Sequence, residues 1–554
     1  MKANSNYIRI NILLALVLLM AACSLDRFPE TEFSDQQFWN TENDLKFAAN
    51  RLYQQLAGVQ LDSRADDNVN QTVNLISNGA WSIPSTSGDW SGPYAMIFTA
   101  NNILEKGQKA VVEEAVKNRY FAEALFFRAY AYFQLVQKYG DVPLHLKTLD
   151  FNAEELNMPR TDRYQIAAQL YEDLDFATDW LPVFKALPAA EYGRVTKSAA
   201  QALKARIALF LGTFGKYHGI PESAYRPHLQ RAVQSCVFVM EEGHLLFGDY
   251  GKLFMHDGEG PGNTENIFVK IYGVDASNVI LGHNYSRDLE NGRVAVTRNF
   301  IRQYLYNDGL PAFGEKNDLK ANRSAFFVPE DKEQSYNTVF ANRDPRLTYT
   351  LFQAGEEAYK GPWVPTTTLG SRTAYATKKG FSIADWQTNG AGTTDKILIR
   401  YAEVLLTYAE AKYELDADIS DADLDRTINL LRRRAGLDVK LSNSFVSAHG
   451  LNMLEEIRRE RNVELALEGF RYPDIIRWKL AETVLTQTLL GAKYTAQEWV
   501  GADVRNLNLN SDEVLVVEDK GTRRFDPAKD YHYPVPLNEI SLSGGNIIQN
   551  PNWK

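Results

Sequence analysis

NRYFAEALFFRAYAYFQLVQKYG, residues 118–140, is the stretch that decides the fold. Its apolar side chains recur at three- and four-residue steps, at Tyr120, Phe121, Ala124, Leu125, Phe127, Ala131 and Leu135. This spacing predicts a helix with one apolar face, and Gly140 is placed to end it. The segment therefore indicates a fold in which long helices pack together.

Other segments show the same periodicity. One lies before it, at residues 44–56, and seven lie after it, at residues 162–181, 196–213, 225–242, 395–415, 422–435, 450–469 and 472–490. With 118–140, the later segments form neighbouring pairs, with small residues such as Ala199, Ala202 and Ala205 where helices would touch. Helix-turn-helix repeats of the tetratricopeptide kind have this organisation, although their strict consensus is absent. The sequence predicts a mostly α fold: four tetratricopeptide-like helix pairs, within residues 118–243 and 395–490, forming a superhelical scaffold.

Two long stretches lack the helical period. Residues 58–92 and 245–394 are rich in Gly, Asn, Asp, Ser and Pro, with only short strand-like runs such as Asn266 to Tyr272. Irregular segments of this length are usually functional. We expect a large loop-rich lobe on one side of the scaffold, in a single domain of residues 41–554 whose C-terminal segment is 491–554.

The N-terminus has the three parts of a signal peptide. Lys2 and Arg9 precede an apolar run from Ile12 to Met20, and Ala21 and Ala22 precede Cys23. The run is too short to span a bilayer, which needs about 20 apolar residues. We expect cleavage after residue 22, acylation of Cys23 and a lipidated tether over residues 23–40. The alternative is an ordinary secretory peptide that happens to precede a cysteine.

Composition excludes several classes of protein. Removal of residues 1–22 leaves 532 residues, enough for one very large domain or two to three ordinary ones. The net charge of −10 and the lack of basic clusters argue against nucleic-acid binding. Cys236 is the only cysteine besides Cys23, so an acylated chain has no intramolecular disulfide and depends on a large core.

Motifs for catalysis are missing. The sequence has no His-Glu-x-x-His, phosphate loop, Gly-x-Ser-x-Gly or cysteine pair, and its eight histidines are scattered. The carboxylate pair of a glycoside hydrolase is brought together by the fold, so the sequence does not exclude this activity. The charged segment 455–471 places Arg458, Arg461 and Glu464 at three-residue steps. We interpret it as an Arg/Glu network between helices, continued by Arg477 and Trp478; an anion site is the alternative.

Six pieces of the chain together resemble the SusD/RagB family of surface glycan-binding lipoproteins of Bacteroidetes. They are the Cys23 lipobox, Phe38-Trp39, RAYAYFQLVQKYGDVPL (128–144), LIRYAEVLLTYAEAKYE (398–414), EIRRERNVELALEGFRYPDIIRW (456–478) and YHYPVPLNEISLSGGNIIQNPNW (531–553). Each piece alone is weak, but their order and spacing are specific and extend over nearly the whole mature chain.

The resemblance implies four tetratricopeptide-like helix pairs that support an irregular lobe. It also implies a lipid-anchored position on the outer membrane, facing outward, as a lid over a SusC-like TonB-dependent transporter barrel. Such proteins bind oligosaccharides and pass them to the barrel without catalysis. A peptide- or glycopeptide-uptake lid, a glycoside hydrolase and a gate that binds nothing are the alternatives. No cofactor is expected; structural calcium is left open by the Asp and Asn content of the lobe, without EF-hand spacing.

In the family the ligand site lies mainly in the loops after the first helix and in the lobe, and a sugar needs flat rings for its C–H face and polar groups for its hydroxyls. The residues of these loops that fit are Asp67, Asn78, Trp81, Asn284, Tyr285, Trp363 and Trp386. Trp81 is the strongest candidate, because it lies off any periodic face. Trp90 starts a helical pattern and is expected in the core. Each of these candidate aromatic residues could instead only hold its own loop in place. The negative net charge disfavours an acidic glycan, unless a local Arg/Lys pocket reverses that.

Overall fold

The computed structural model describes residues 38–59, 62–150, 152–273, 282–312, 322–367, 371–499 and 503–554. Cys23, the predicted signal peptide and most of the predicted tether lie outside these residues. Within them, no helix combines the length and apolar character that a membrane crossing requires.

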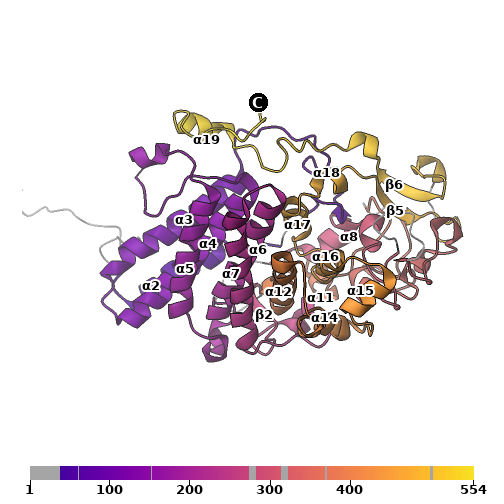
Figure 1. Ribbon diagram of the computed structural model, residues 1–554, viewed down its shortest axis with the longest axis horizontal. Helices are drawn as coiled ribbons and strands as arrows, with labels where there is room; N and C mark the ends of the chain where they lie inside the picture. The colour runs from indigo at the N-terminus through magenta and orange to yellow at the C-terminus, as the bar shows by residue number, and fades with distance from the viewer. Residues whose placement is uncertain are drawn as a thin grey trace, which may run out of the picture.

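A stack of helices forms one end of the molecule (Figure 1). Helices α4 (Glu114–Tyr139), α5 (Arg163–Trp180), α6 (Lys197–Tyr217) and α7 (Glu222–Glu241) pack in sequence order. Helix α12 (Tyr401–Asp416) then packs on α7, and α16 (Met453–Glu464) on α12. Gly212 of α6 lies against Leu229 of α7, where an added Cβ would come within 2.7 Å of that side chain. The predicted stack of paired helices is confirmed.

The stack begins earlier than the sequence predicted. Helix α2 (Glu42–Gln54) lies where the sequence predicted a helix over residues 44–56. It is followed by α3 (Gly88–Lys106), which packs on α4, whereas the sequence placed a loop over residues 58–92 and began the paired helices at residue 118. Gly88, Gly92 and Pro93 resemble loop residues, but the Ser87 side chain caps the helix and Trp90 is buried. Burial of this apolar face outweighs the weak local propensity.

The C-terminal helices differ from prediction at their ends. The segment predicted as a helix from residue 395 begins with strand β4 (Lys396–Arg400), which pairs antiparallel with β2 (Asn266–Lys270). The predicted helix 450–469 ends at Glu464, and 472–490 breaks into two short helices and a strand. The elements of this part are α13 (Asp421–Asp425), α14 (Ile428–Ala435), α15 (Asn443–His449), α17 (Arg471–Arg477), α18 (Ala481–Val484), β5 (Leu489–Lys493) and β6 (Val514–Glu518).

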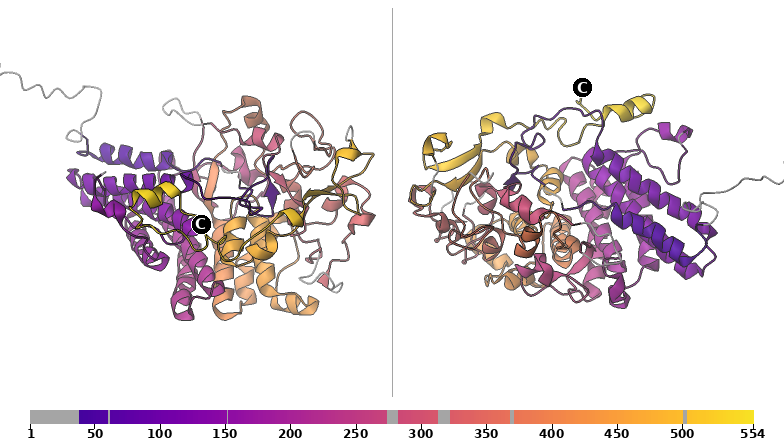
Figure 2. Two further views of the ribbon diagram at one scale, coloured as in Figure 1. Left: turned by 90° about the horizontal axis from the view of Figure 1, so that it is seen from above. Right: turned by 180° about the vertical axis from the view of Figure 1, so that it is seen from behind.

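The predicted loop-rich lobe lies beside the stack and has a core of its own (Figure 2). Its elements are short: β1 (Asn68–Val69) pairs with β3 (Ala295–Val296), and the helices are α8 (Tyr285–Glu290), α9 (Arg298–Ile301), α10 (Arg346–Thr350) and α11 (Ile383–Thr388). Short 3-10 turns in the chain are η1 (Gly107–Lys109), η2 (Glu154–Asn157), η3 (Phe184–Ala186), η4 (Ala189–Glu191), η5 (Lys252–Phe254), η6 (His256–Gly258), η8 (Glu330–Lys332), η9 (Tyr336–Phe340), η10 (Val504–Asn506) and η11 (Lys520–Thr522).

The C-terminal segment returns from the lobe to the helical stack, along the upper edge in Figure 1, and carries α19 (Leu537–Leu542). Tyr533 N donates to Lys138 O at 2.7 Å, and Leu537 N donates to Pro84 O at 3.0 Å. The last residues therefore join the lobe to the start of α3 and the end of α4.

Candidate functional site

A cleft lined by both polar and apolar residues lies where the lobe meets the helical stack. It consists of two hollows of about 130 and 170 Å³, which share Lys396, Ile397, Glu468 and Gly469 in their walls. The first hollow faces the lobe, between α8 and the segment 379–380. The second faces α4 and α6. Strand β4 and the loop after α16 thus form a ridge between two halves of one cleft.

Tyr285 and Lys379 form the lobe side of the cleft. The half-buried Tyr285 hydroxyl donates to Lys379 O at 3.2 Å. Gly380 has a φ of +76°, and a Cβ there would come within 2.9 Å of the Tyr285 ring, so this close approach favours glycine. Lys379 Nζ donates to Glu468 Oε1 at 2.7 Å and to Tyr250 Oη at 3.0 Å. Burial lowers the pKa of Lys379 to about 8.

Asp395 and Lys396 lie at the ridge. Asp395 Oδ1 accepts from Tyr272 N at 2.8 Å, and burial, with the charge of Glu259, raises the pKa of Asp395 to about 7. Lys396 Nζ donates to Gly58 O at 2.5 Å. Burial, reinforced by the charge of Lys270, lowers the pKa of Lys396 to about 8. The cleft therefore holds ionisable groups whose pKa values are shifted by burial and by neighbouring charges.

The stack side combines rings, amides and ion pairs. Tyr130, Phe133 and Phe210 supply rings, and Gln134 and Gln137 supply amides on the same wall. The ion pairs that involve its charged residues are Arg64–Asp62, Lys138–Asp89, Arg206–Glu403, Arg461–Asp474 and Arg477–Glu410. Amides and charged side chains can bond sugar hydroxyls, and rings can cover an apolar sugar face.

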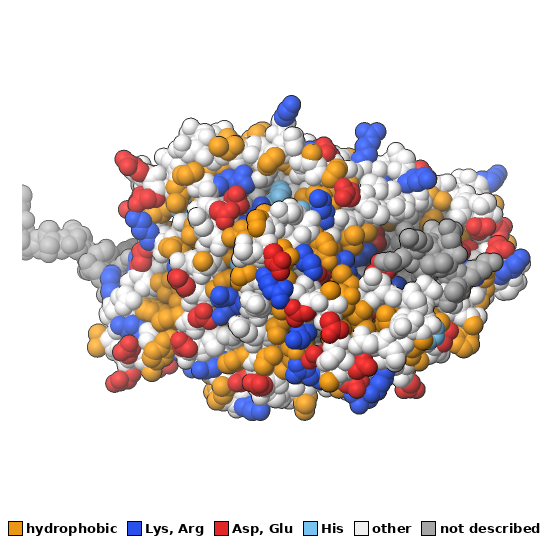
Figure 3. Space-filling model, in the orientation of Figure 1, with side chains coloured by type: hydrophobic (Ala, Val, Ile, Leu, Met, Phe, Trp, Pro, Cys, Tyr) orange, Lys and Arg blue, Asp and Glu red, His pale blue; other side chains and the backbone are white. Residues whose placement is uncertain are grey.

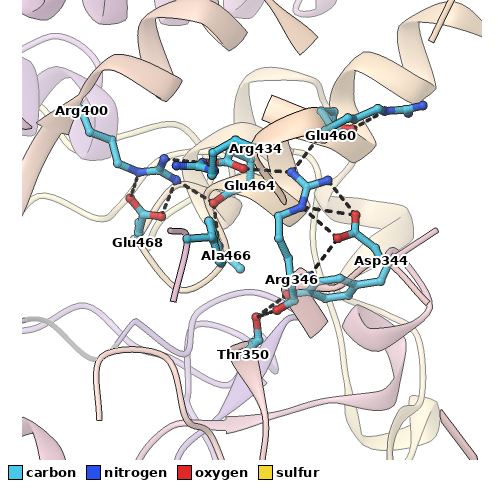
Figure 4. A network of polar contacts seen from close by, with 12 residues as sticks. Asp344, Arg346, Thr350, Arg400, Arg434, Glu460, Glu464, Ala466 and Glu468 are labelled. Atoms are coloured by element: carbon cyan, nitrogen blue, oxygen red, sulfur yellow. Dashed lines mark hydrogen bonds and ion pairs between the residues drawn. The ribbon is translucent and has the colours of Figure 1, made fainter. Parts of the chain in front are cut away.

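A buried network lies beneath the cleft (Figure 4). The carboxylate of Glu464 accepts from Arg346 Nη1 at 2.9 Å, from Arg400 Nη1 at 2.6 Å and from Arg434. These three guanidinium groups hold the pKa of Glu464 well below its usual range, although burial opposes the shift. Arg400 also pairs with Glu468, at 2.7 Å from Nε to Oε2. The network therefore fixes one wall of the cleft.

The predicted Arg/Glu network is confirmed in the same helices. Arg458 pairs with Glu414 at 3.0 Å and Arg461 with Asp474 at 2.8 Å. Arg477 pairs with Glu410, whose carboxylate also accepts from Trp478 Nε1. Because the carboxylates neutralise these arginines, the segment 455–478 stabilises packing.

Three of the predicted ligand residues come together in the structure. Tyr285 lines the cleft, and the exposed Asn284 precedes it at the start of α8. Trp386 lies on α11, which packs against α8. Its indole donates to Glu290 Oε2 at 2.8 Å, and Arg287 lies 4.0 Å above its ring. The ring of Trp386 is thus half-buried and partly covered.

The other predicted ligand residues lie outside the cleft. Trp81 packs edge-on against Tyr533 at 4.8 Å and Trp553 at 4.7 Å between ring centroids. Asn78 Oδ1 accepts from Ala80 N within its own loop. Trp363 and Asp67 are each 4% exposed, so their side chains are closed to a ligand in this structure. As expected, Trp90 belongs to the core.

The cleft also contains residues that sequence reasoning missed: Lys379, Asp395, Lys396 and Glu468. The last three lay inside or beside segments that were predicted as helices, where charged residues are ordinary surface positions. The short apolar run Ile397, Leu398 and Ile399, with two β-branched residues, was the available signal for a strand.

A third hollow of about 450 Å³ lies at the end of the stack, against α3 and α19. Its wall is mainly apolar, with Tyr94, Phe98, Leu156 and Ile547, and Phe98 is 53% exposed. Among the described residues, no three His, Cys, Asp or Glu side chains are placed to hold a metal ion, so the calcium that the sequence left open has no such site there. On the face shown in Figure 3, acidic and basic side chains intermingle without a large area of one sign.

Comparison with known proteins agrees with this architecture. A family model described as the SusD family matches residues 272–553, and a model described as "Starch-binding associating with outer membrane" matches residues 37–209. The chain belongs to the SusD family. Stack, lobe and C-terminal segment are thus the parts of a SusD-like fold.

Relatives of this SusD-family chain cover nearly its whole length. It is 26% identical to the SusD-like protein P2 of Formosa agariphila over 516 residues, 86% of this chain and 91% of that one. It is also 26% identical to a SusD-like protein of Bacteroides ovatus, over 83% of this chain and 80% of that one. A crystal structure of a SusD-like carbohydrate binding protein from Bacteroides fragilis superposes with a TM-score of 0.75 at 25% identity, covering 91% of this chain and 99% of that one.

Proposed function

We propose that this SusD-family protein is an outer-membrane lipoprotein that captures oligosaccharides and passes them to a partner TonB-dependent transporter, without chemistry on the sugar. The observation that carries the proposal is the cleft between stack and lobe, where the Tyr285 ring lies beside fixed polar groups. The similarity to a solved SusD-like carbohydrate binding protein and the starch-binding description of one matching model support a glycan as the ligand.

The polar groups of the cleft are fixed before a ligand arrives. Lys379 and Glu468 bond one another, and Arg400 holds Glu468 from the buried network. A fixed site loses little conformational entropy on binding, which favours capture. The hollows are small and partly open, so we expect modest affinity, which suits the release of a ligand to a transporter.

Glu468 of the cleft is poorly placed to act as nucleophile or base in glycoside hydrolysis. Hydrolysis needs one carboxyl as acid and another as nucleophile or base. Both oxygens of Glu468 accept from Arg400, and one also accepts from Lys379. These cations lower the pKa of Glu468 and occupy its lone pairs, so it is a weak nucleophile and base.

Calorimetry of the purified protein against a panel of neutral and acidic oligosaccharides tests the proposal. We expect at least one saccharide to bind, and Tyr285→Ala to weaken it about tenfold, because the ring loses its contact with the sugar face. Tyr285→Phe is the matched control, since it keeps the ring and should bind within about twofold of wild type. Undiminished binding by Tyr285→Ala would refute the site.

The same assays separate the alternatives. The mainly apolar hollow with Phe98 favours a peptide ligand at the end of the stack, and saturable binding of peptides that Phe98→Ala abolishes would support a peptide-uptake lid. Release of shorter products from any saccharide would establish a hydrolase. A protein that binds neither class would be a gate only.

Anchoring through Cys23 is the second part of the proposal. We expect the mature protein in the outer-membrane fraction with an acylated N-terminal cysteine, detected by mass spectrometry. Cys23→Ala should move it to the soluble fraction, because two or three acyl chains hold a protein durably and none remain in the variant. Membrane retention of an unacylated chain would contradict the anchor.

A further inference from the structure

In the part of the chain that the structure describes, one cation of the cleft has no acidic partner. The walls of the two hollows carry seven lysines and arginines. Six of them form an ion pair with a carboxylate: Arg64, Lys138, Arg206, Lys379, Arg461 and Arg477. Across the described residues, Lys396 has no carboxylate within 4.0 Å of its ammonium group. It is also the one cation that lies in both walls.

A second unpaired lysine lies beside it. Lys270 of β2 and Lys396 of β4 are direct partners in the antiparallel register. Lys270 is 8% exposed, and in the described part of the chain it too has no carboxylate in ion-pair range. Like charges directly opposite each other on paired strands are destabilising. Two ammonium groups in this arrangement repel each other, which favours the binding of a negative charge beside them.

The protein supplies only part of that charge. Lys270 Nζ donates to Leu56 O, and Lys396 Nζ donates to Gly58 O, both just beyond the end of α2. The C-terminus of a helix carries about half a negative elementary charge. The nearest acid along the chain is Asp395, and both burial and the charge of Glu259 disfavour its ionised form. Within the described residues, no carboxylate lies in ion-pair range of either ammonium group at the ridge of the cleft.

We propose that the ammonium group of Lys396, supported by Lys270, binds the anionic group of an acidic saccharide, a uronate carboxylate or a sulfate ester, where the two hollows join. This inference rests on the proposed glycan capture and names its ligand class. The net charge of −10 disfavours acidic ligands at long range, but short-range charge-assisted hydrogen bonds decide specificity inside a partly closed site. Tyr285, in the wall of the adjoining hollow, is available to the same saccharide.

Two matched pairs of saccharides test the inference by calorimetry. One pair is tetragalacturonate and its carboxyl-reduced form; the other is a sulfated galactan oligosaccharide and its desulfated form. We expect the acidic member of at least one pair to bind about tenfold more tightly than its neutral partner. The pair that shows the preference identifies the anionic group. The preference should shrink as salt screens the charges.

Variants of Lys396 test whether this residue causes the preference for the acidic saccharide. In Lys396→Met the acidic and neutral members of that pair should bind equally tightly, whereas Lys396→Arg should keep the preference. Lys109→Met, an exposed lysine outside both hollows, is the matched control. Circular dichroism and the melting temperature verify that each variant is folded. Equal binding within both pairs, or a preference that survives Lys396→Met, would overturn the inference.

Failure of the inference can be told from failure of the proposed function. If other, neutral glycans of the panel bind in the Tyr285-dependent manner but acidic groups give no advantage, only the assignment of Lys396 falls. If no glycan binds at all, both fall.

Discussion

Asp67 shows how burial changes the meaning of a single residue. The sequence placed it in a polar loop as a partner for a sugar, whereas in the structure it is 4% exposed and its Oδ1 has no hydrogen-bond partner among the described residues. Burial raises its pKa to about 7, reinforced by the charges of Asp66 and Asp62, while Arg471 opposes the shift. Asp67 is thus a carboxyl that is partly protonated near neutral pH.

The shifted pKa of Asp67 predicts a pH-dependent stability. A carboxyl whose pKa is higher in the folded state holds its proton more tightly there, so the free energy of unfolding falls as pH rises from about 4 to about 7. Asp67→Asn removes this loss. We expect the variant to exceed wild type by about 1–2 kcal/mol at pH 8 and to match it at pH 4.

Urea denaturation at both pH values measures this difference. Asp418→Asn, at an exposed aspartate, is the control and should leave the free energy of unfolding unchanged at either pH. An Asp67→Asn protein that is no more stable than wild type at pH 8 would show that a cation or a hydrogen-bond donor stabilises the Asp67 carboxylate in solution.

At the scale of elements, long periodic helices were predictable and their neighbours were not. Helices α4 to α7 lie within a few residues of the predicted spans, because local spacing of apolar residues specifies one face. Strand β4 was wrongly joined to the helix after it. Its apolar residues run into those of α12, and only pairing with β2, more than a hundred residues earlier, makes the segment a strand.

The residues of the candidate site also divide into those that the sequence predicts and those that it does not. Tyr285 was predictable, as an aromatic residue in a polar loop of the lobe. Lys379, Lys396 and Glu468 were not, because each is an ordinary charged residue until the fold sets β4 beside the loop after α16. The cleft is made of segments that are distant in sequence, so no local pattern could reveal it.

At the scale of the molecule, one buried network joins lobe to stack. Arg346, on α10 of the lobe, lies 2.7 Å from Asp344 and reaches Glu460 at 2.6 Å and Glu464 at 2.9 Å on α16. All four side chains are at most 1% exposed. The cost of burying these charges is met only while every carboxylate has its cation.

Loss of Arg346 should therefore destabilise the whole protein. We expect Arg346→Met to lower the free energy of unfolding by about 3–5 kcal/mol, because buried carboxylates lose their counter-charge. Urea denaturation followed by tryptophan fluorescence measures it. Arg505→Met is the control: Arg505 pairs with Asp503 at the surface and is 84% exposed, so its loss should leave the free energy of unfolding nearly unchanged. Equal effects of the two variants would contradict a structural role for the network.

The sequence by itself determined the helical class, the order of the stacked helices, the irregular lobe and, through motifs of fixed order, membership of the SusD family. Each of these is encoded locally, in the spacing of apolar residues or in short runs of the chain. The tertiary structure alone decided which loop residues are open to a ligand and which charges have partners. Burial and ion pairing depend on contacts between segments far apart in sequence. These contacts close Trp363 and Asp67 to solvent and, within the described parts of the chain, leave Lys396 without an acid.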